Sequence, residues 1–139
     1  MLSASINYPL RGAVTWKSTV GTNVASDALS NLASSGVTGG AMVIVGEDYG
    51  EGSSIMQERS YAFAMKAQMW LLDPRPNLPN IVDMVEKGFE LSEASNTPIF
   101  YMMRIRGCHV TGEFVARDNV APTYHSQVPV TPNREPEKI

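Results

Sequence analysis

Three short segments of the sequence carry the side chains best suited to bind or transform a ligand. A polar segment runs from Ser18 to Asn23, an acidic one from Glu47 to Ser54, and a basic one from Arg104 to His109. Free backbone N–H groups at the start of a helix bind anions or the polar edge of a ring. The first segment therefore predicts a binding loop, with Gly21 allowing close approach of a ligand to the backbone. An ordinary capped strand-to-helix connection is the alternative.

The acidic segment does not match a nucleotide phosphate-binding loop, because no lysine follows its last glycine, Gly52. Its carboxylates suit three roles: holding a metal ion, bonding an amine, or facing solvent. Solvent exposure is the expectation for Glu51, since unpaired acidic residues are rarely buried. Arg59, farther along, is expected at the surface or in an ion pair.

A neighbouring cysteine and histidine, Cys108 and His109, invite comparison with a catalytic nucleophile and its base. We expect no such role, because adjacent residues on an extended chain point to opposite faces. The other histidine, His125, lies in a proline-rich tail. A single cysteine excludes an internal disulfide, and it excludes an iron–sulfur cluster held by this chain alone, which needs about four thiolates. A zinc site or catalytic triad within the chain is not expected.

Alternating strands and helices are predicted to position these segments. Continuous apolar runs, typical of strands buried on both faces, predict the strands, and helical spacing of apolar residues predicts the helices. The expected strands cover 13–17, 40–45, 70–72 and 99–103; the expected helices cover 22–34, from Ser53 or Ser54 to Gln68, and 79–95.

Capping and stop signals refine these boundaries. Thr22, Asn23 and Ser26 are candidate caps for the first helix, and Gly36 is expected to end it. The helix over 79–95 has an expected apolar stripe and an expected solvent face. The stripe comprises Ile81, Val82, Val85 and Phe89, and the solvent face comprises Asp83, Glu86, Lys87, Glu90 and Glu93.

The pattern predicts an α/β fold: a parallel sheet with helices on both faces. Ligands in such folds bind beyond the carboxyl ends of the strands, where all three polar segments are expected. We expect one domain over residues 1–120, followed by a proline-rich tail or linker over 121–139.

Composition narrows the class of protein further. The net charge is −3 with no basic block, which argues against a nucleic-acid surface. The apolar runs are too short to span a membrane, and the first residues do not form a signal peptide. The expectation is a cytoplasmic protein.

The stretch Ala13 to Asp27 resembles the alpha subunit of indolepyruvate ferredoxin oxidoreductase, within the pyruvate ferredoxin oxidoreductase superfamily. In that family a strand ends in a lysine, here Lys17, and a Gly-x-Asn-x-Ala pattern then opens a helix. The resemblance continues to about Gly112. It includes Gly39-Gly40, Ser53-Ser54, Gln57, Asp73-Pro74, Phe89-Glu90-Leu91-Ser92-Glu93, Pro98 and Arg104.

This resemblance implies the thiamine-diphosphate-binding fold, and in particular the domain that holds the aminopyrimidine ring. It implies oxidative decarboxylation of a 2-oxoacid, with electrons passing to ferredoxin, and the family suggests an aryl pyruvate as the substrate. Magnesium and the iron–sulfur clusters would lie on partner domains, and the diphosphate on a partner domain or subunit. The implied cofactor-binding residues are Ser18, Thr19, Gly21, Asn23, Ser53, Ser54 and Gln57, with Arg104 as substrate-binding residue or interdomain contact.

The sequence departs from the family pattern in several places. Ser18 replaces a frequent histidine, and Glu47-Asp48-Tyr49-Gly50 stands where Asp-Asp-Pro-Gly is usual. Roughly two βα units, about 60 residues, are expected before Ala13 in the family, and they hold the glutamate that bonds the aminopyrimidine. The Gly-Asp-Gly motif for the diphosphate is also absent.

These departures leave three functions open. The chain is expected to be part of an enzyme that is active only with partner domains, and the alternatives are a non-catalytic binding or assembly module with the same fold, or an unrelated flavodoxin-like or nucleotide-binding domain. Without the first units, an apolar sheet edge is expected to be exposed, which predicts a dimer or a hetero-complex.

Overall fold

A computed structural model describes residues 2–48 and 59–120, and the structural account is confined to them. Four strands alternate with helices along the chain, as the sequence predicts. In order, the elements are η1 (Leu2–Ile6), β1 (Gly12–Lys17), η2 (Ser18–Thr22), α1 (Ser26–Ser35), β2 (Ala41–Glu47), α2 (Ser60–Ala67), β3 (Trp70–Leu72), α3 (Leu78–Ser95), β4 (Ile99–Arg104) and α4 (Ile105–Cys108).

The four strands form one parallel sheet in the order β1-β2-β4-β3. The two central strands, β2 and β4, are buried almost throughout. This confirms the prediction that strands with continuous apolar sequences are buried on both faces of the sheet. The α/β class and the parallel sheet are therefore confirmed. β1 and β3 form the two edges of the sheet.

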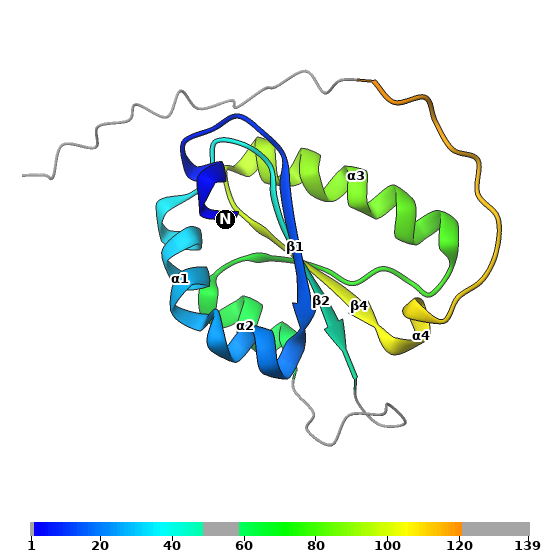
Figure 1. The fold of residues 1–139 in the computed structure, drawn as a ribbon, viewed down its shortest axis with the longest axis horizontal. Coiled ribbons are helices and arrows are strands. Elements are labelled where there is room, and N and C mark those ends of the chain that lie inside the picture. Colours follow the sequence, from blue (N-terminus) through cyan, green and yellow to red (C-terminus); the bar gives the residue numbers. More distant parts are fainter. Residues whose placement is uncertain (1, 49–58, 121–139) are drawn as a thin grey trace, which may run out of the picture.

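Helices cover both faces of this sheet (Figure 1). On one face, α1 and α2 pack over Val43, Val45 and Phe100. On the other, α3 packs over Met42, Ile99 and Tyr101 through Val85 and Phe89. Burial of these apolar side chains supplies most of the free energy that holds the layers together.

The ends of α1 and α3 follow from local backbone chemistry. Gly36 ends α1 with a φ of 71°, as predicted, and Asn96 ends α3 in the left-handed region with a φ of 52°. At the start of α3, the Asn77 side chain accepts a hydrogen bond from the Asn80 N–H at 3.0 Å. The start of α1 differs from prediction: it begins at Ser26 after Ala25, and no side chain caps it.

Several other expectations are wrong. A π-helical turn, η2, occupies Ser18–Thr22, where the sequence predicts a simple turn. The helix α2 begins at Ser60 after an extended Arg59, and the expected cap at Ser53 or Ser54 lies outside the described residues. On α3, Val82 is exposed rather than packed, and Glu93 is buried rather than solvated because it pairs with Arg11. The N-terminal 3-10 helix, η1, is an addition to the predicted elements. Across the described part of the chain, no helix has the length and apolar character needed to cross a membrane.

Candidate functional site

The carboxyl ends of β1, β2 and β4 are neighbours in the sheet, so the described parts of the three polar segments lie along one edge. Lys17 is paired with Gly46 and Glu47 with Arg104 in the strand register. The order β1-β2-β4 therefore places Ser18, Glu47 and Arg104 in sequence across the strand ends. This juxtaposition is the one that the rule for ligand sites in parallel sheets predicts.

The first polar segment turns sharply into η2 beneath the side chain of Trp16. The indole Nε1–H donates to Thr22 Oγ1 at 3.1 Å, which ties the end of the strand to the end of the turn. Ser18 and Thr19 are buried, and Asn23 is exposed. The structure therefore brings two of the predicted residues into the interior and leaves one on the surface.

Gly21 makes a close contact within the chain that the sequence does not predict. A Cβ atom at this position would lie 2.2 Å from Cγ of Trp16. The close approach that requires a glycine is thus made by the indole ring of the same chain. The sequence gives no direct sign of this contact, because the two residues lie on consecutive elements whose packing depends on the π-helical turn.

Two ion pairs connect neighbouring strand ends at this edge. Lys17 Nζ donates to Asp48 Oδ2 at 2.8 Å, joining the ends of β1 and β2. Arg104 Nε donates to Asp73 Oδ1 at 2.8 Å, and Nη2 of the same guanidinium donates to Oδ2. This bidentate pair joins the ends of β4 and β3. Asp48 thus bonds an amine, which is one of the roles expected of the acidic segment. The amine belongs to Lys17 of the same chain.

Glu47 is the most buried charged side chain at the edge, with an exposed fraction of 2%. Its two carboxylate oxygens each accept from the Ser60 N–H at 3.3 Å, and no ion pair involves it among the described residues. Glu47 also influences the carboxyl group of Asp73. Burial raises the pKa of Asp73, and the negative charge of Glu47 raises it further.

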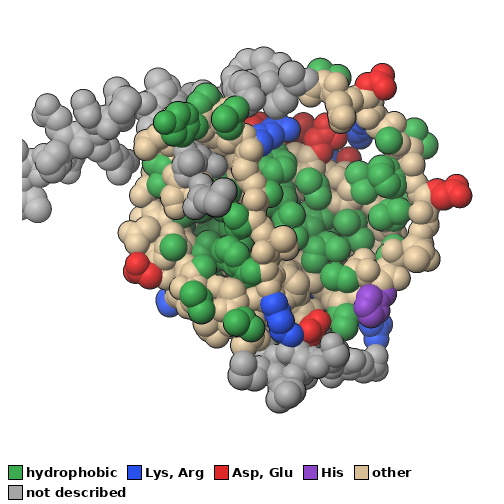
Figure 2. Space-filling model, viewed as in Figure 1, with side chains coloured by type: hydrophobic (Ala, Val, Ile, Leu, Met, Phe, Trp, Pro, Cys, Tyr) green, Lys and Arg blue, Asp and Glu red, His purple; other side chains and the backbone are tan. Residues whose placement is uncertain are grey.

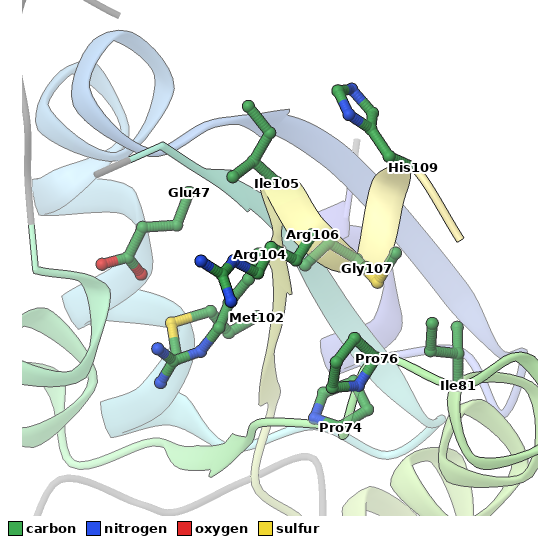
Figure 3. Close-up of a pocket in the computed structure, with 11 residues that line it drawn as sticks. Glu47, Pro74, Pro76, Ile81, Met102, Arg104, Ile105, Arg106, Gly107 and His109 are labelled. Carbon is green, nitrogen blue, oxygen red and sulfur yellow. The ribbon is translucent and has the colours of Figure 1, made fainter. Parts of the chain in front are cut away.

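A cavity of about 700 Å³ opens around the end of β4. Its walls come from β2, β4, α4, the loop after β3 and the start of α3 (Figure 3). Apolar and polar side chains both line it: Met102 and Ile81 are apolar, and Glu47, Arg104 and His109 are polar. A mixed lining of this kind is typical of small-molecule sites, where a few polar groups orient a largely apolar ligand.

Cys108 and His109 lie at a helical turn, because Cys108 ends α4 and His109 follows with a φ of −99°. The expectation of an extended chain at this point is wrong, so the reason given against a cysteine–histidine pair does not apply. Both residues are exposed. Within the described ranges, no group of three or more acidic, histidine or cysteine side chains is arranged to hold a metal ion.

Ser53, Ser54 and Gln57, the remaining predicted cofactor residues, lie outside the described residues. Conversely, Asp73 and Ser60 emerge as site residues that sequence reasoning missed. The sequence pattern marks Asp73 only as the end of a strand. A signal for its role did exist, since an aspartate that ends one strand is a natural partner for an arginine that ends its neighbour.

Comparison with known proteins finds similarity to indolepyruvate oxidoreductase subunits. Over 103 residues, the chain is 32% identical to the indolepyruvate oxidoreductase subunit IorA of Pyrococcus abyssi and 31% identical to that of Pyrococcus horikoshii. Each match covers 74% of this chain and 16% of the relative. IorA of Methanothermobacter marburgensis is 33% identical over 93 residues, which are 67% of this chain and 15% of the relative.

The chain thus spans about a sixth of the length of these relatives. For the matched segment, the similarity supports the family of the IorA subunit. No protein-family profile matches the chain, and no solved structure matches it.

Proposed function

We propose that this chain is a cofactor-binding part of an indolepyruvate-type 2-oxoacid:ferredoxin oxidoreductase and acts together with partner domains. The observation that carries the proposal is the similarity to IorA over 103 residues, together with the polar segments that meet at the strand ends. The relatives are named as oxidoreductase subunits, which favours a role within a larger assembly over independent activity.

The proposed cofactor is thiamine diphosphate, shared with a partner that binds its diphosphate and magnesium. When bound, it supplies the carbon nucleophile that decarboxylation of a 2-oxoacid requires. The residues proposed to contact it are Ser18, Thr19, Gly21 and Asn23, with Ser53, Ser54 and Gln57 beyond the described ranges. We further propose that the domain occupies residues 1–120 and that the protein is cytoplasmic.

One feature of the described chain fits a polar ring at this position. The Ser18 hydroxyl is buried beside the end of β1 and has no hydrogen-bond partner, so it is available to a ligand. The role of this chain would be to hold and orient such a ring while excluding water from it. Arg104 is proposed to steer an anionic substrate from its anchored position against Asp73.

Reconstitution tests the proposal. The chain is co-expressed with a protein that carries the Gly-Asp-Gly motif and cysteine clusters, and electron transfer from indolepyruvate to a viologen dye is measured with and without thiamine diphosphate. We expect co-purification and cofactor-dependent activity that neither protein shows alone. The matched variants are Ser18→Val, which should lower activity at subsaturating cofactor, and Ser34→Val on the exposed face of α1, which should not.

The alternative functions predict different results. A stable chain that neither associates with such a partner nor binds thiamine diphosphate would favour a non-catalytic module. Tight binding of a nucleotide by the chain alone would instead favour an unrelated nucleotide-binding domain.

A further inference from the structure

The carboxylate of Glu47 is buried at the end of β2 without the ion pair or the full set of hydrogen bonds that usually stabilises a buried charge. Its only hydrogen bonds in the described structure come from one donor, the Ser60 N–H, which is shared between the two oxygens at 3.3 Å each. A carboxylate offers about four acceptor positions, so at least half of its capacity remains unused. Leaving a charged group buried in this way is costly unless something else binds it.

Two further polar groups at the same strand ends are also unsatisfied. The hydroxyls of Ser18 and Ser60 are buried, since each residue is 1% exposed, and neither makes a hydrogen bond. Ser60 begins α2, and its N–H contacts Glu47, while Ser18 follows Lys17, whose register partner precedes Glu47. Unpaired buried hydroxyls are uncommon in folded proteins, and here they lie around an underused carboxylate.

The third observation is access to the cavity. Glu47 belongs to the wall of the cavity of about 700 Å³, which the apolar side chain of Met102 also lines (Figure 3). Glu47 and Met102 face the same side of the sheet, because Glu47 pairs with Arg104, two residues after Met102. A ligand in the cavity can therefore place an apolar ring on Met102 and reach Glu47.

We propose that Glu47, which lines the cavity, is an acceptor site for an N–H donor group on a small planar ligand such as an amidine. A protonated or strongly donating nitrogen supplies both the charge and the hydrogen bonds that the carboxylate lacks. The two neighbouring ion pairs already neutralise Lys17 with Asp48 and Arg104 with Asp73, which leaves Glu47 for the ligand. This inference rests on the proposed function in that it identifies a binding group within the same site.

The test uses the 139-residue chain and benzamidine, a flat apolar ring that carries an amidinium. Two-dimensional NMR follows the backbone amides of Ser18, Glu47 and Ser60 during titration. We expect saturable shifts at these amides with benzamidine. Benzoate, which has the same ring but no N–H donor, should leave them unmoved. Equal shifts with benzoate would overturn the proposal.

Two variants assign the contact. Glu47→Gln keeps an acceptor for the Ser60 N–H but removes the charge, and it should weaken benzamidine binding about tenfold or more. Glu90→Gln on the exposed face of α3 makes the same chemical change and should leave the affinity as it is. The melting temperature of Glu47→Gln should equal or exceed that of the parent, because the variant relieves an uncompensated charge. A clear fall would identify a structural role and overturn the proposal.

Thiamine diphosphate, titrated separately in the presence of the partner protein, distinguishes this inference from the proposed function. Benzamidine binding that depends on Glu47, without thiamine diphosphate binding, supports the acceptor site and contradicts the cofactor. Thiamine diphosphate binding that is unchanged in Glu47→Gln, together with no Glu47-dependent benzamidine binding, supports the cofactor and overturns the acceptor site.

Discussion

At the residue scale, the site combines side chains that stabilise the fold with side chains that do not. Thr22 accepts a hydrogen bond from Trp16, whereas the equally buried hydroxyl of Ser18 has no partner. Stability and ligand binding make opposite demands on a buried hydroxyl, since an unsatisfied one destabilises the free protein. This contrast is the reason for proposing Ser18, rather than Thr22, as a ligand contact.

The first prediction compares these two residues. Ser18→Ala should leave the free energy of unfolding unchanged or raise it by about 1 kcal/mol, because no hydrogen bond is lost. Thr22→Val should lower it by about 1 kcal/mol or more, because the indole N–H of Trp16 loses its acceptor. Urea denaturation measures both. A loss for Ser18→Ala larger than that for Thr22→Val would mean that Ser18 has a structural partner.

The second prediction concerns the packing of Gly21 against the indole. Gly21→Ala should lower the free energy of unfolding by about 1–3 kcal/mol, since the added methyl group overlaps the Trp16 ring. Gly46→Ala is the matched control, because among the described residues its Cβ would meet only the Trp16 carbonyl oxygen at 3.8 Å, an ordinary contact. Thermal melts followed by tryptophan fluorescence compare the two. Equal stability of both variants would contradict the described packing.

How much of the site the sequence predicts depends on whether a signal is local. The polar residues that follow apolar runs, Ser18 and Arg104, are predictable because parallel strands gather their carboxyl ends at one edge. The burial of Glu47 and its contact with Ser60 are not, because they depend on how α2 packs against a strand end 13 residues earlier in the chain. The contact of Gly21 with Trp16 is missed although the two residues are close in sequence, because it depends on the geometry of the π-helical turn.

At the scale of elements, an ion pair connects the segment before β1 to α3. Arg11 Nε and Nη2 donate to the two oxygens of Glu93 at 2.7 and 2.8 Å, and the guanidinium lies 5.4 Å from the centre of the Phe89 ring. Glu93 raises the pKa of Arg11 through this hydrogen bond. Helical periodicity alone assigns Glu93 to solvent, because the partner that buries it lies 82 residues away.

The third prediction follows from this burial. Arg11→Met should lower the free energy of unfolding by about 1–3 kcal/mol, because the Glu93 carboxylate is left largely buried without its partner. Lys87→Met, which breaks the exposed pair with Asp83, should cost less than about 0.5 kcal/mol. Guanidinium chloride would screen these charges, so urea is the denaturant for the measurement. Equal effects would show that Glu93 is solvated in solution.

The fourth prediction concerns the bond between β4 and α3. The Tyr101 hydroxyl donates to the Ile81 carbonyl oxygen at 2.7 Å, and burial raises the pKa of Tyr101 to about 12. The unfolded tyrosine titrates at about 10, so the folded state binds more protons between these values. Stability from this group is therefore complete below about pH 10 and is lost as pH rises towards 12.

Tyr101→Phe tests this assignment. The variant should be less stable by about 1 kcal/mol at neutral pH, through the lost hydrogen bond, but less sensitive to pH above about 10. Spectrophotometric titration of the parent should show one tyrosine that ionises later than the others. Identical alkaline unfolding curves for parent and variant would place the titration elsewhere.

Strands and helix ends are predicted best where a sequence pattern is compatible with only one local structure. The uniformly apolar runs that form β2 and β4 specify doubly buried strands, and Gly36 specifies the end of α1. The π-helical turn at Ser18–Thr22 carries no comparable pattern, since its polar residues suit a loop equally well. Its geometry goes with the contacts of Trp16 with Gly21 and Thr22, which the residue types alone do not reveal.

At the scale of the whole molecule, the sheet has an apolar and unpaired edge at β1. Hydrophobic side chains flank both sides of the strand at the centre of the view (Figure 2), and β1 pairs only with β2 within the described structure. Val20 and Val24, just beyond the strand, are 60% and 85% exposed. Apolar surface beside free strand N–H and C=O groups favours pairing with another strand.

The fifth prediction is that this edge drives association of the isolated chain. In a parallel pair, alternate residues direct their backbone groups to one neighbour, and the Gly12 N–H bonds to Gly40 on the β2 side. The backbone groups of Thr15 therefore point to the free side of β1. Thr15→Lys places a charge beside this edge without removing a bond to β2, and it should shift the chain towards the monomer.

Light scattering coupled to gel filtration measures the effect over a range of concentrations. The control is Ser34→Lys on the exposed face of α1, which adds the same charge away from the edge and should leave the association state of the parent unchanged. If the parent is monomeric at high concentration, the β1 edge does not drive association. If both variants dissociate the parent equally, net charge rather than strand pairing controls it. Dissociation by Thr15→Lys alone identifies β1 as the surface through which the chain joins a second strand, which is the behaviour required of a part that acts only within a larger assembly.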